Sequence, residues 1–385
     1  MKEKGKNVLR CMRKLLLTTI RSVWFWLIML LPLAMLLRLC ARKIPGLADL
    51  YNHTVYRGVS IFWNQVTGVV PVSIAELLLM VLPFAVLGYL IFVIVRVIKS
   101  KHRRLKTAGK GLLRLVSLAC AVYFLYVTNC GMNYYCSSFA EQSGLEVKPT
   151  SAGELYEVCV YLGTKASECR SRLEQNEEGV MVLDKADARR AAAEAMNRLH
   201  RQYGFFPDGY SIPKPLILSR GMSYLNLTGV YFPFTFESNV NVDSPDCFIP
   251  FTMCHELAHV RGYMKEQDAN FIAYLACIYS DNDAFMYSGY LSALHYASSS
   301  LFGADRELYR QYASCLSDEV WTDLSDDYHY WQQFQTPVAE AASAINDNYL
   351  KNNHQDSGVK SYGLMTDLVI AHYYSEKSAE MQKKY

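Results

Sequence analysis

Three apolar runs lie within the first 130 residues of this 385-residue chain, and they constrain its fold more than any other feature. Their most apolar stretches read SVWFWLIMLLPLAMLL, IAELLLMVLPFAVLGYLIFVIVRVI and LLRLVSLACAVYFLYV. Helices of about 17–25 mainly apolar residues are long enough to cross a bilayer. The sequence therefore predicts a membrane region over residues 1–130, with transmembrane helices at about 17–39, 74–98 and 112–130.

Two of these runs have alternative interpretations. The first run could be a cleaved signal peptide, but it lies between Arg21 and Arg38 and no small-x-small cleavage site follows it. A retained anchor is therefore the better prediction. The third run is short enough to be a buried helix of a globular domain, so the number of crossings depends on it.

Lysine and arginine are distributed unevenly around the apolar runs. The first fourteen residues and the stretch KSKHRRLKTAGKGLLR are basic, whereas the loop over 41–72 has only Arg42, Lys43 and Arg57. Cytoplasmic loops are enriched in these residues, so three crossings would place everything after about Asn129 outside the cytoplasm. With two crossings that region would be cytoplasmic instead. Since the basic residues cluster at the crossings, we expect a lipid bilayer as partner and no nucleic acid.

Residues 131–385 read as a mainly helical α+β domain with a small β-sheet. Helical spacing follows Ser151, a predicted N-cap, and an Ala-rich helix runs from the predicted cap Asp184 to Gly204. The stretch KPLILSRGMSYLNLTGVYFPFTFESNVNV is rich in β-branched and aromatic residues and predicts two or three short strands. After Pro250 the pattern is helical again.

The motif HELAH at His255, Glu256 and His259 is the part of the chain that points to chemistry. On a helix, residues four apart share one face, so both imidazoles can reach one ion. Such a pair is typical of zinc sites, in which the glutamate beside the first ligand acts as general base toward a metal-bound water. Apolar neighbours at Leu257 and Val260 fit a helix buried in a core.

A zinc site of this kind needs a third protein ligand, and the nearest candidate is Glu266. Gly262 can end the motif helix in a left-handed conformation and turn the chain back toward the metal. Asp268 and a distant residue are the alternatives. Asn270, four residues after Glu266, is predicted to hydrogen-bond a ligand from the same helical face.

The stretch EQDANF from Glu266 resembles the ExxAN element of gluzincin peptidases, in which the first glutamate is the third zinc ligand. The chain resembles a family of bacterial membrane proteins, the domain-of-unknown-function 3810 family. The resemblance rests on GVYFPFTFESNVN, on PFTMCHELAHVRGYMKEQDANFIAYL and, more loosely, on NDNYLKNNHQDSGVKSYGLMTDLVI. It implies a zincin-like domain, Zn²⁺ as cofactor, and a multi-pass protein of the bacterial cell membrane.

These observations predict a membrane-anchored zinc metallohydrolase, a peptidase acting on a protein or peptide substrate with Glu256 as general base. The alternatives are a zinc-binding membrane receptor or scaffold with little turnover, and a hydrolase of another amide or ester. The strand segment GVYFPFTFESNVN is a candidate for pairing with an extended substrate. Candidates for the donor to the oxyanion are Tyr263, Tyr290, His295, Tyr362 and His372.

Overall fold

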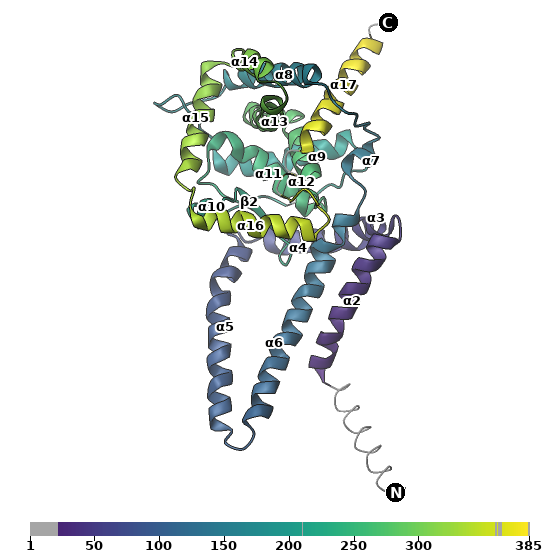
Figure 1. Cartoon of the computed structure of the whole chain (residues 1–385), viewed down its shortest axis with the longest axis vertical. Helices are drawn as coiled ribbons and strands as arrows, with labels where there is room; N and C mark the ends of the chain where they lie inside the picture. Colours follow the sequence, from purple (N-terminus) through teal and green to yellow (C-terminus); the bar gives the residue numbers. More distant parts are fainter. Residues whose placement is uncertain (1–21, 210, 359, 361–363, 384–385) are drawn as a thin grey trace. The chain divides into compact units, whose positions relative to one another are not determined.

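The computed structural model describes residues 22–209, 211–358, 360 and 364–383. The chain forms two compact units, which we call the membrane unit and the globular unit. The membrane unit comprises Met1–Ala48 and Leu77–Tyr135, and the globular unit comprises Asp49–Glu76 and Cys136–Tyr385. Each unit is considered by itself below (Figure 1).

The membrane unit consists of long apolar helices. They are α2 (Val23–Lys43), α5 (Ile74–Lys99) and α6 (Arg104–Tyr126), which continues through the short turns η2 (Val127–Gly131) and η3 (Asn133–Tyr135). All three are long and apolar enough to cross a membrane. No described residue of α5 after Glu76 is buried, and an apolar surface of this extent indicates a membrane protein. The three predicted spans are thus confirmed as candidate membrane helices, although residues 17–21 lie outside the described part.

The segment between the first two spans belongs to the globular unit, whereas the sequence assigned it to the membrane region. It contains α3 (Leu47–Tyr51), the π-turn η1 (Asn52–Tyr56) and α4 (Arg57–Gly68). Its polar side chains explain the difference, because they are buried against the globular unit and not exposed to lipid. Asn52, Ser60, Asn64 and Thr67 are all buried.

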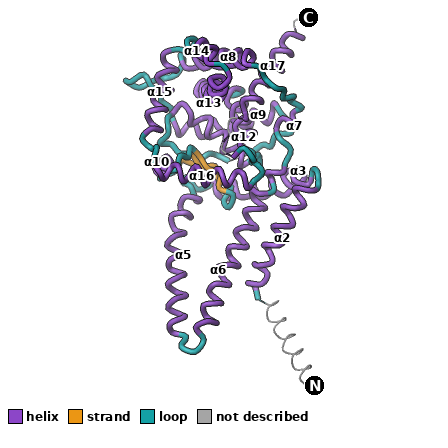
Figure 2. The backbone as a smooth tube through the Cα atoms, viewed as in Figure 1, coloured by secondary structure: helices purple, strands orange, loops and turns teal. Residues whose placement is uncertain are grey.

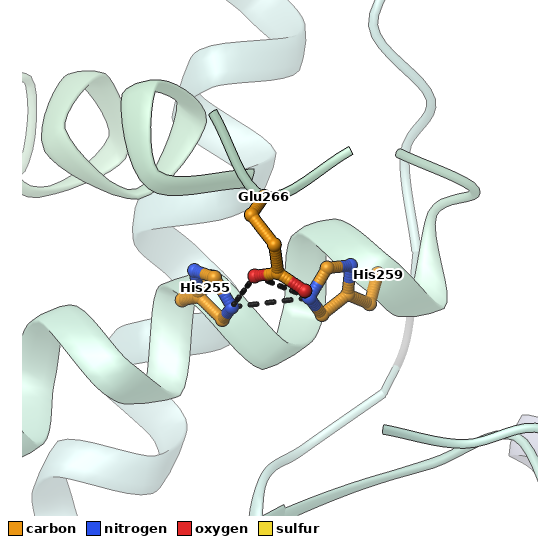
Figure 3. Close-up of side chains that lie close together, drawn as sticks. All are labelled: His255, His259 and Glu266. Carbon is orange, nitrogen blue, oxygen red and sulfur yellow. Dashed lines mark hydrogen bonds and ion pairs between the residues drawn. The ribbon is translucent and has the colours of Figure 1, made fainter. Parts of the chain in front are cut away.

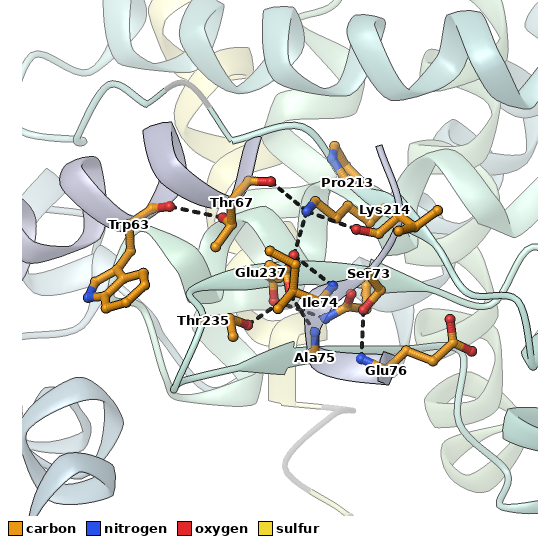
Figure 4. Close-up of polar contacts among 12 residues, drawn as sticks. Trp63, Thr67, Ser73, Ile74, Ala75, Glu76, Pro213, Lys214, Thr235 and Glu237 are labelled. Carbon is orange, nitrogen blue, oxygen red and sulfur yellow. Dashed lines mark hydrogen bonds and ion pairs between the residues drawn. The ribbon is translucent and has the colours of Figure 1, made fainter. Parts of the chain in front are cut away.

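Glu237 fastens the end of this segment to the sheet (Figure 4). Its carboxylate accepts the backbone N–H groups of Ile74 at 3.1 Å and Ala75 at 2.7 Å, the first two residues of α5. Lys214 lies 2.5 Å from Glu237 and also donates to the carbonyl groups of Thr67 and Val72. A buried carboxylate is tolerated when it is paired and hydrogen-bonded in this way, so the sequence between the spans completes this part of the globular unit.

The predicted strands form a three-stranded sheet. Its strands are β1 (Lys214–Pro215), β2 (Gly229–Phe232) and β3 (Glu237–Val240), in the order β1-β3-β2. β1 runs parallel to β3, and β2 pairs antiparallel with β3, with Gly229 opposite Val240. Helix α10 (Ser219–Tyr224) lies between β1 and β2 in sequence. Figure 2 shows how little of the unit is strand.

Helices make up most of the globular unit, which confirms the mainly helical prediction. The predicted caps are present, because the Ser151 hydroxyl accepts from Glu154 N–H and the Asp184 carboxylate accepts from Ala186 and Asp187. The predicted end of this helix at Gly204 is confirmed to within two residues. The helix ends at Gln202, and its C-cap Tyr203 leaves it in an extended conformation, so no left-handed glycine is needed.

Helix α11 (Ile249–Val260), which carries the HELAH motif, lies in the core of this unit. All of its residues are buried, and it packs against the sheet and against three helices. The remaining elements are α7 (Phe139–Ser143), α8 (Ala152–Arg170), α9 (Lys185–Gln202), η4 (Asp246–Phe248), α12 (Glu266–Ile278), α13 (Asp283–Ala304), α14 (Arg306–Ala313), α15 (Asp318–Gln332), α16 (Pro337–Asn352) and α17 (Met365–Lys383).

Candidate metal centre

The two histidines of the motif face one another on α11 (Figure 3). His255 Nε2 and His259 Nε2 are 3.0 Å apart, as expected for residues one helical turn apart. The other ring nitrogen of His259, Nδ1, lies 2.7 Å from the carbonyl oxygen of Tyr263. Donation of the Nδ1 proton to this carbonyl leaves Nε2 as the free ligand atom and fixes the ring orientation.

Helix α11 ends as the sequence predicts. Gly262 has a φ of 94°, in the left-handed region that favours glycine. Its N–H donates to the carbonyl of His259 at 2.9 Å, and the N–H of Tyr263 donates to Ala258 at 3.1 Å. This hydrogen-bond pair is a Schellman termination, which reverses the chain so that α12 begins with Glu266 facing the two histidines.

Glu266 completes a group of three buried ligands. Its Oε2 lies 3.3 Å from His255 Nε2 and 3.7 Å from His259 Nε2. Ligand atoms about 2.05 Å from a tetrahedral zinc ion would be about 3.3 Å apart, so these distances bracket the value for one shared ion. His255, His259 and Glu266 form the one His/Cys/Asp/Glu group of metal-binding geometry among the described residues.

The donor set and its burial both fit a metal ion. Two imidazoles and one carboxylate are the ligands of catalytic zinc sites, which keep a further position open. Within the described part of the chain, His255 Nδ1 and Glu256 Oε2 are buried polar atoms without a hydrogen-bond partner. Orphaned buried atoms of this kind call for a group that the protein itself does not supply, such as a metal-held water.

The three ligands influence one another's protonation. Burial raises the pKa of Glu266, but His259 and His255 beside it outweigh burial and hold its pKa at about 2. Burial lowers the pKa of His259, but Glu266 reverses this effect and brings it to about 9. Without a metal, the site is therefore a buried carboxylate paired with a protonated imidazole.

Glu256 interacts with the neighbouring histidines and also meets the edge strand β2. A Cβ atom added at Gly229 would lie only 2.5 Å from Glu256 Oε1, so glycine is the residue that leaves room for this carboxylate. The N–H of Tyr231 donates to Glu256. Burial raises the pKa of Glu256, and the neighbouring histidines offset part of this effect. A carboxylate with a raised pKa is suited to accept and release a proton near neutral pH.

The other predicted residues of this region lie in different surroundings. Asp268 is buried away from the three ligands, where it accepts a 3.4 Å hydrogen bond from the N–H of Phe139, and burial raises its pKa to about 6. Asn270 hydrogen-bonds the hydroxyl of Tyr296. It also lies with His255 in the wall of a cavity of about 190 Å³.

Of the candidate oxyanion donors, the structure brings only His295 to this cavity. The hydroxyl of Tyr263 donates to Gln142, and Tyr290 packs against Tyr161 in the core. His372 is buried against Phe271, and burial lowers its pKa to about 4. Tyr362 lies outside the described residues.

The structure adds cavity residues that sequence reasoning missed. Tyr296 follows His295 on α13, and Asp327 and Trp331 come from α15. These helices follow the motif by tens of residues, and nothing in their local sequence indicates that they reach it. Asp327 and Trp331 are four residues apart, so the sequence shows that they share one face of a helix. It does not show that this face lines the cavity.

Comparisons with known proteins identify the family of this chain but do not indicate an activity. No curated protein and no solved structure matches the chain. A family model described as "Protein of unknown function (DUF3810)" matches residues 51–370. The matched region begins in the segment between the first two spans and includes all three candidate ligands. The chain therefore belongs to the DUF3810 family.

Proposed function

We propose that this protein is a membrane-anchored zinc peptidase with a zincin-like globular unit. The observation that carries the proposal is the convergence of His255, His259 and Glu266 on one point, with distances of 3.0, 3.3 and 3.7 Å between their ligand atoms. Zinc bound there would polarise the substrate carbonyl and lower the pKa of a water molecule.

Glu256 is the proposed general base. It adjoins the first ligand in sequence and sits against β2, so it is held at the rim of the centre. There it would take a proton from the attacking water and pass it to the leaving amine. His295 and Tyr296, which line the cavity beside His255, are our candidates for donating a hydrogen bond to the developing oxyanion.

The edge strand supports a peptide substrate. β2 pairs with β3 on one side only, and the N–H of Asn241 donates to the carbonyl of Thr228 at 2.8 Å. Because hydrogen-bonded pairs alternate along an antiparallel ladder, the backbone groups of Gly229 and Tyr231 point away from β3. The N–H of Tyr231 already donates to Glu256, so an extended peptide could add to this edge at Gly229 and carry its scissile bond past Glu256.

The two chain segments that form the globular unit support an extracytoplasmic location. Residues 49–76 and 136–385 form one unit, so they lie on the same side of the membrane. Only α5 and α6 separate them, and therefore both helices cross or neither does. The apolar, unburied surface of α5 favours crossing, which makes α6 a span as well. The basic loop between them then supports our proposal that the globular unit lies outside the cytoplasm.

The test uses the full chain purified in detergent, because residues 49–76 belong to the globular unit. We would compare the wild type with Glu256→Gln, His259→Ala and the surface control Glu194→Gln, measuring bound zinc by elemental analysis and cleavage of a denatured protein. The proposal expects about one zinc per chain in all but His259→Ala. Cleavage should occur only in the wild type and the control.

Two results would count against the proposal in different ways. A wild-type protein that binds no zinc would overturn the metal centre. Zinc in both the wild type and Glu256→Gln, with no cleavage by either, would favour a receptor or scaffold that keeps the metal without turnover.

A further inference from the structure

The cavity beside His255 has four aromatic side chains among the polar residues of its wall. Phe248, Phe251, Tyr296 and Trp331 contribute to it from η4, α11, α13 and α15. Its position next to a candidate ligand makes it the place where a side chain flanking the scissile bond would lie, and this step rests on the proposed function. Aromatic walls suit either an apolar side chain or a cation, because the ring faces are electron-rich.

One carboxylate decides between these two occupants. Asp327 lies in the cavity wall, and no lysine or arginine is among the residues that line it. The indole Nε1 of Trp331 donates to Asp327 Oδ1 at 3.0 Å, which fixes the carboxylate in the aromatic wall. An apolar side chain in this cavity would displace water from the Asp327 carboxylate and would offer that carboxylate no hydrogen bond or positive charge in return.

The charge of Asp327 is not balanced within the described part of the chain. Arg170 neutralises the neighbouring acid Asp323 at 2.6 Å, but no lysine or arginine forms an ion pair with Asp327. Burial raises the pKa of Asp327 to about 6, and Asp326 contributes in the same direction. The wall has two other titratable groups beyond the metal ligand, and burial disfavours the charged form of each: it lowers the pKa of His295 and raises that of Tyr296.

A bound zinc ion would not supply the missing charge. The carboxylates of Glu256 and Glu266 together would balance a divalent cation, which would leave Asp327 as the excess negative charge of the combined site. From this cavity we infer that the protein is specific for a basic residue, lysine or arginine, in the substrate position next to the cleaved bond. The aromatic wall would hold the aliphatic stem, and Asp327 would pair with the cationic end.

The first test maps cleavage sites. The full chain would digest denatured proteins, and mass spectrometry would identify the residues flanking each cut. The inference expects lysine and arginine to dominate one flanking position, and Asp327→Asn to reduce cleavage there by about tenfold or more, because a charge-assisted bond is lost. Asp326→Asn is the matched control, with the same charge change on a neighbour outside the cavity wall. A preference for leucine or phenylalanine at this position would overturn the inference.

The second test does not depend on turnover. Ligand-observed NMR would measure binding of three probes to the Glu256→Gln protein: Nα-acetyl-lysine amide, Nα-acetyl-norleucine amide and norleucine amide with a free α-amine. Tighter binding of the acetyl-lysine probe, lost in Asp327→Asn, would support the pocket even if the wild type cleaves nothing and the peptidase proposal fails. Equal binding of the acetylated probes, or a preference for the free α-amine, would refute a basic side-chain pocket.

Discussion

The phenol of Tyr56 lies 3.2 Å from the carbonyl oxygen of His259 and 3.1 Å from that of Val260. It also contacts the hydroxyl of Tyr231 on β2 at 3.1 Å. A residue from the segment between two membrane spans therefore meets the last turn of the helix that carries the metal ligands. The His259 carbonyl also accepts from the N–H of Gly262 and the Val260 carbonyl from the hydroxyl of Ser60, so Tyr56 adds a further donor that helps to hold this end of the helix in position.

We predict that Tyr56→Phe weakens zinc binding without abolishing it. The ring would still pack against Phe236, but the hydrogen bonds to the helix end and to Tyr231 would be lost. A loss of about 1 kcal/mol corresponds to an affinity about fivefold lower. Competition with a chromophoric chelator would measure this change, with Tyr328→Phe at an exposed position as control. Unchanged zinc affinity would show that Tyr56 does not position His259.

Gly229→Ala should separate catalysis from metal binding. The added methyl group would collide with Glu256 Oε1 at 2.5 Å and with its Cγ at 2.7 Å, and would displace the proposed base. Misplacement of a catalytic group by about 1 Å can lower the rate about a hundredfold. We expect normal zinc content and a reduced kcat. Gly221→Ala, whose new Cβ would lie 3.8 Å from its nearest neighbour, is the control.

Zinc binding at pH 7 should release about one proton. His259, with its pKa raised to about 9, is protonated in the metal-free protein, and it must lose that proton to bind zinc through Nε2. Zinc affinity should therefore rise about tenfold per pH unit and level off near pH 9. Calorimetry in two buffers of different ionisation enthalpy would count the protons. Glu266→Gln should lower the pKa of His259 and reduce the release, and identical release in this variant would contradict the assignment.

The buried pair of Lys214 and Glu237 should stabilise the globular unit far more than exposed pairs do. Their side chains are 5% and 1% exposed, so Lys214→Met would leave a buried carboxylate without its cation. Such a loss costs about 3–5 kcal/mol, and thermal unfolding in detergent would measure it. Replacing both residues, as Lys214→Met with Glu237→Gln, should recover part of this loss. Lys148→Met removes an exposed partner of Glu146 and should have little effect.

Reporter fusions should place the two ends of α6 on opposite sides of the membrane. A fluorescent protein joined after Ser100, in the basic loop before α6, should fold and fluoresce in the cytoplasm. Alkaline phosphatase joined at the C-terminus should be active, because it needs an oxidising compartment. A fluorescent fusion after Ser100 together with an inactive phosphatase fusion at the C-terminus would show that α6 does not cross.

The local part of the candidate site could be predicted from the sequence. The spacing of His255 and His259 fixes their common face, and Gly262 indicates the turn that brings Glu266 back, because helix geometry and glycine's freedom at positive φ act within a few residues. The sequence also indicated the strands and the caps at Ser151 and Asp184 for the same reason.

The rest depends on contacts between distant segments. Nothing near Tyr56 indicates that it reaches His259, since 203 residues separate them. His372 and Tyr290 have the right chemistry for an oxyanion donor, but packing places them in the core. Asp327 was not predicted, because a carboxylate within the acidic sequence LSDDY reads as a solvated helix face until its neighbours are known.

The bonds from Glu237 to Ile74 and Ala75 also set an order of events during biosynthesis. Glu237 follows Ile74 by 163 residues, and ribosomes add about 5–20 residues per second, so the loop emerges roughly 10–30 seconds before its partner exists. Throughout that interval the backbone N–H groups of Ile74 and Ala75 lack their carboxylate partner. The nascent chain thus passes through a stage at which α2, α5 and α6 have been synthesised, whereas the strand that binds the start of α5 and the helices that carry the metal ligands have not.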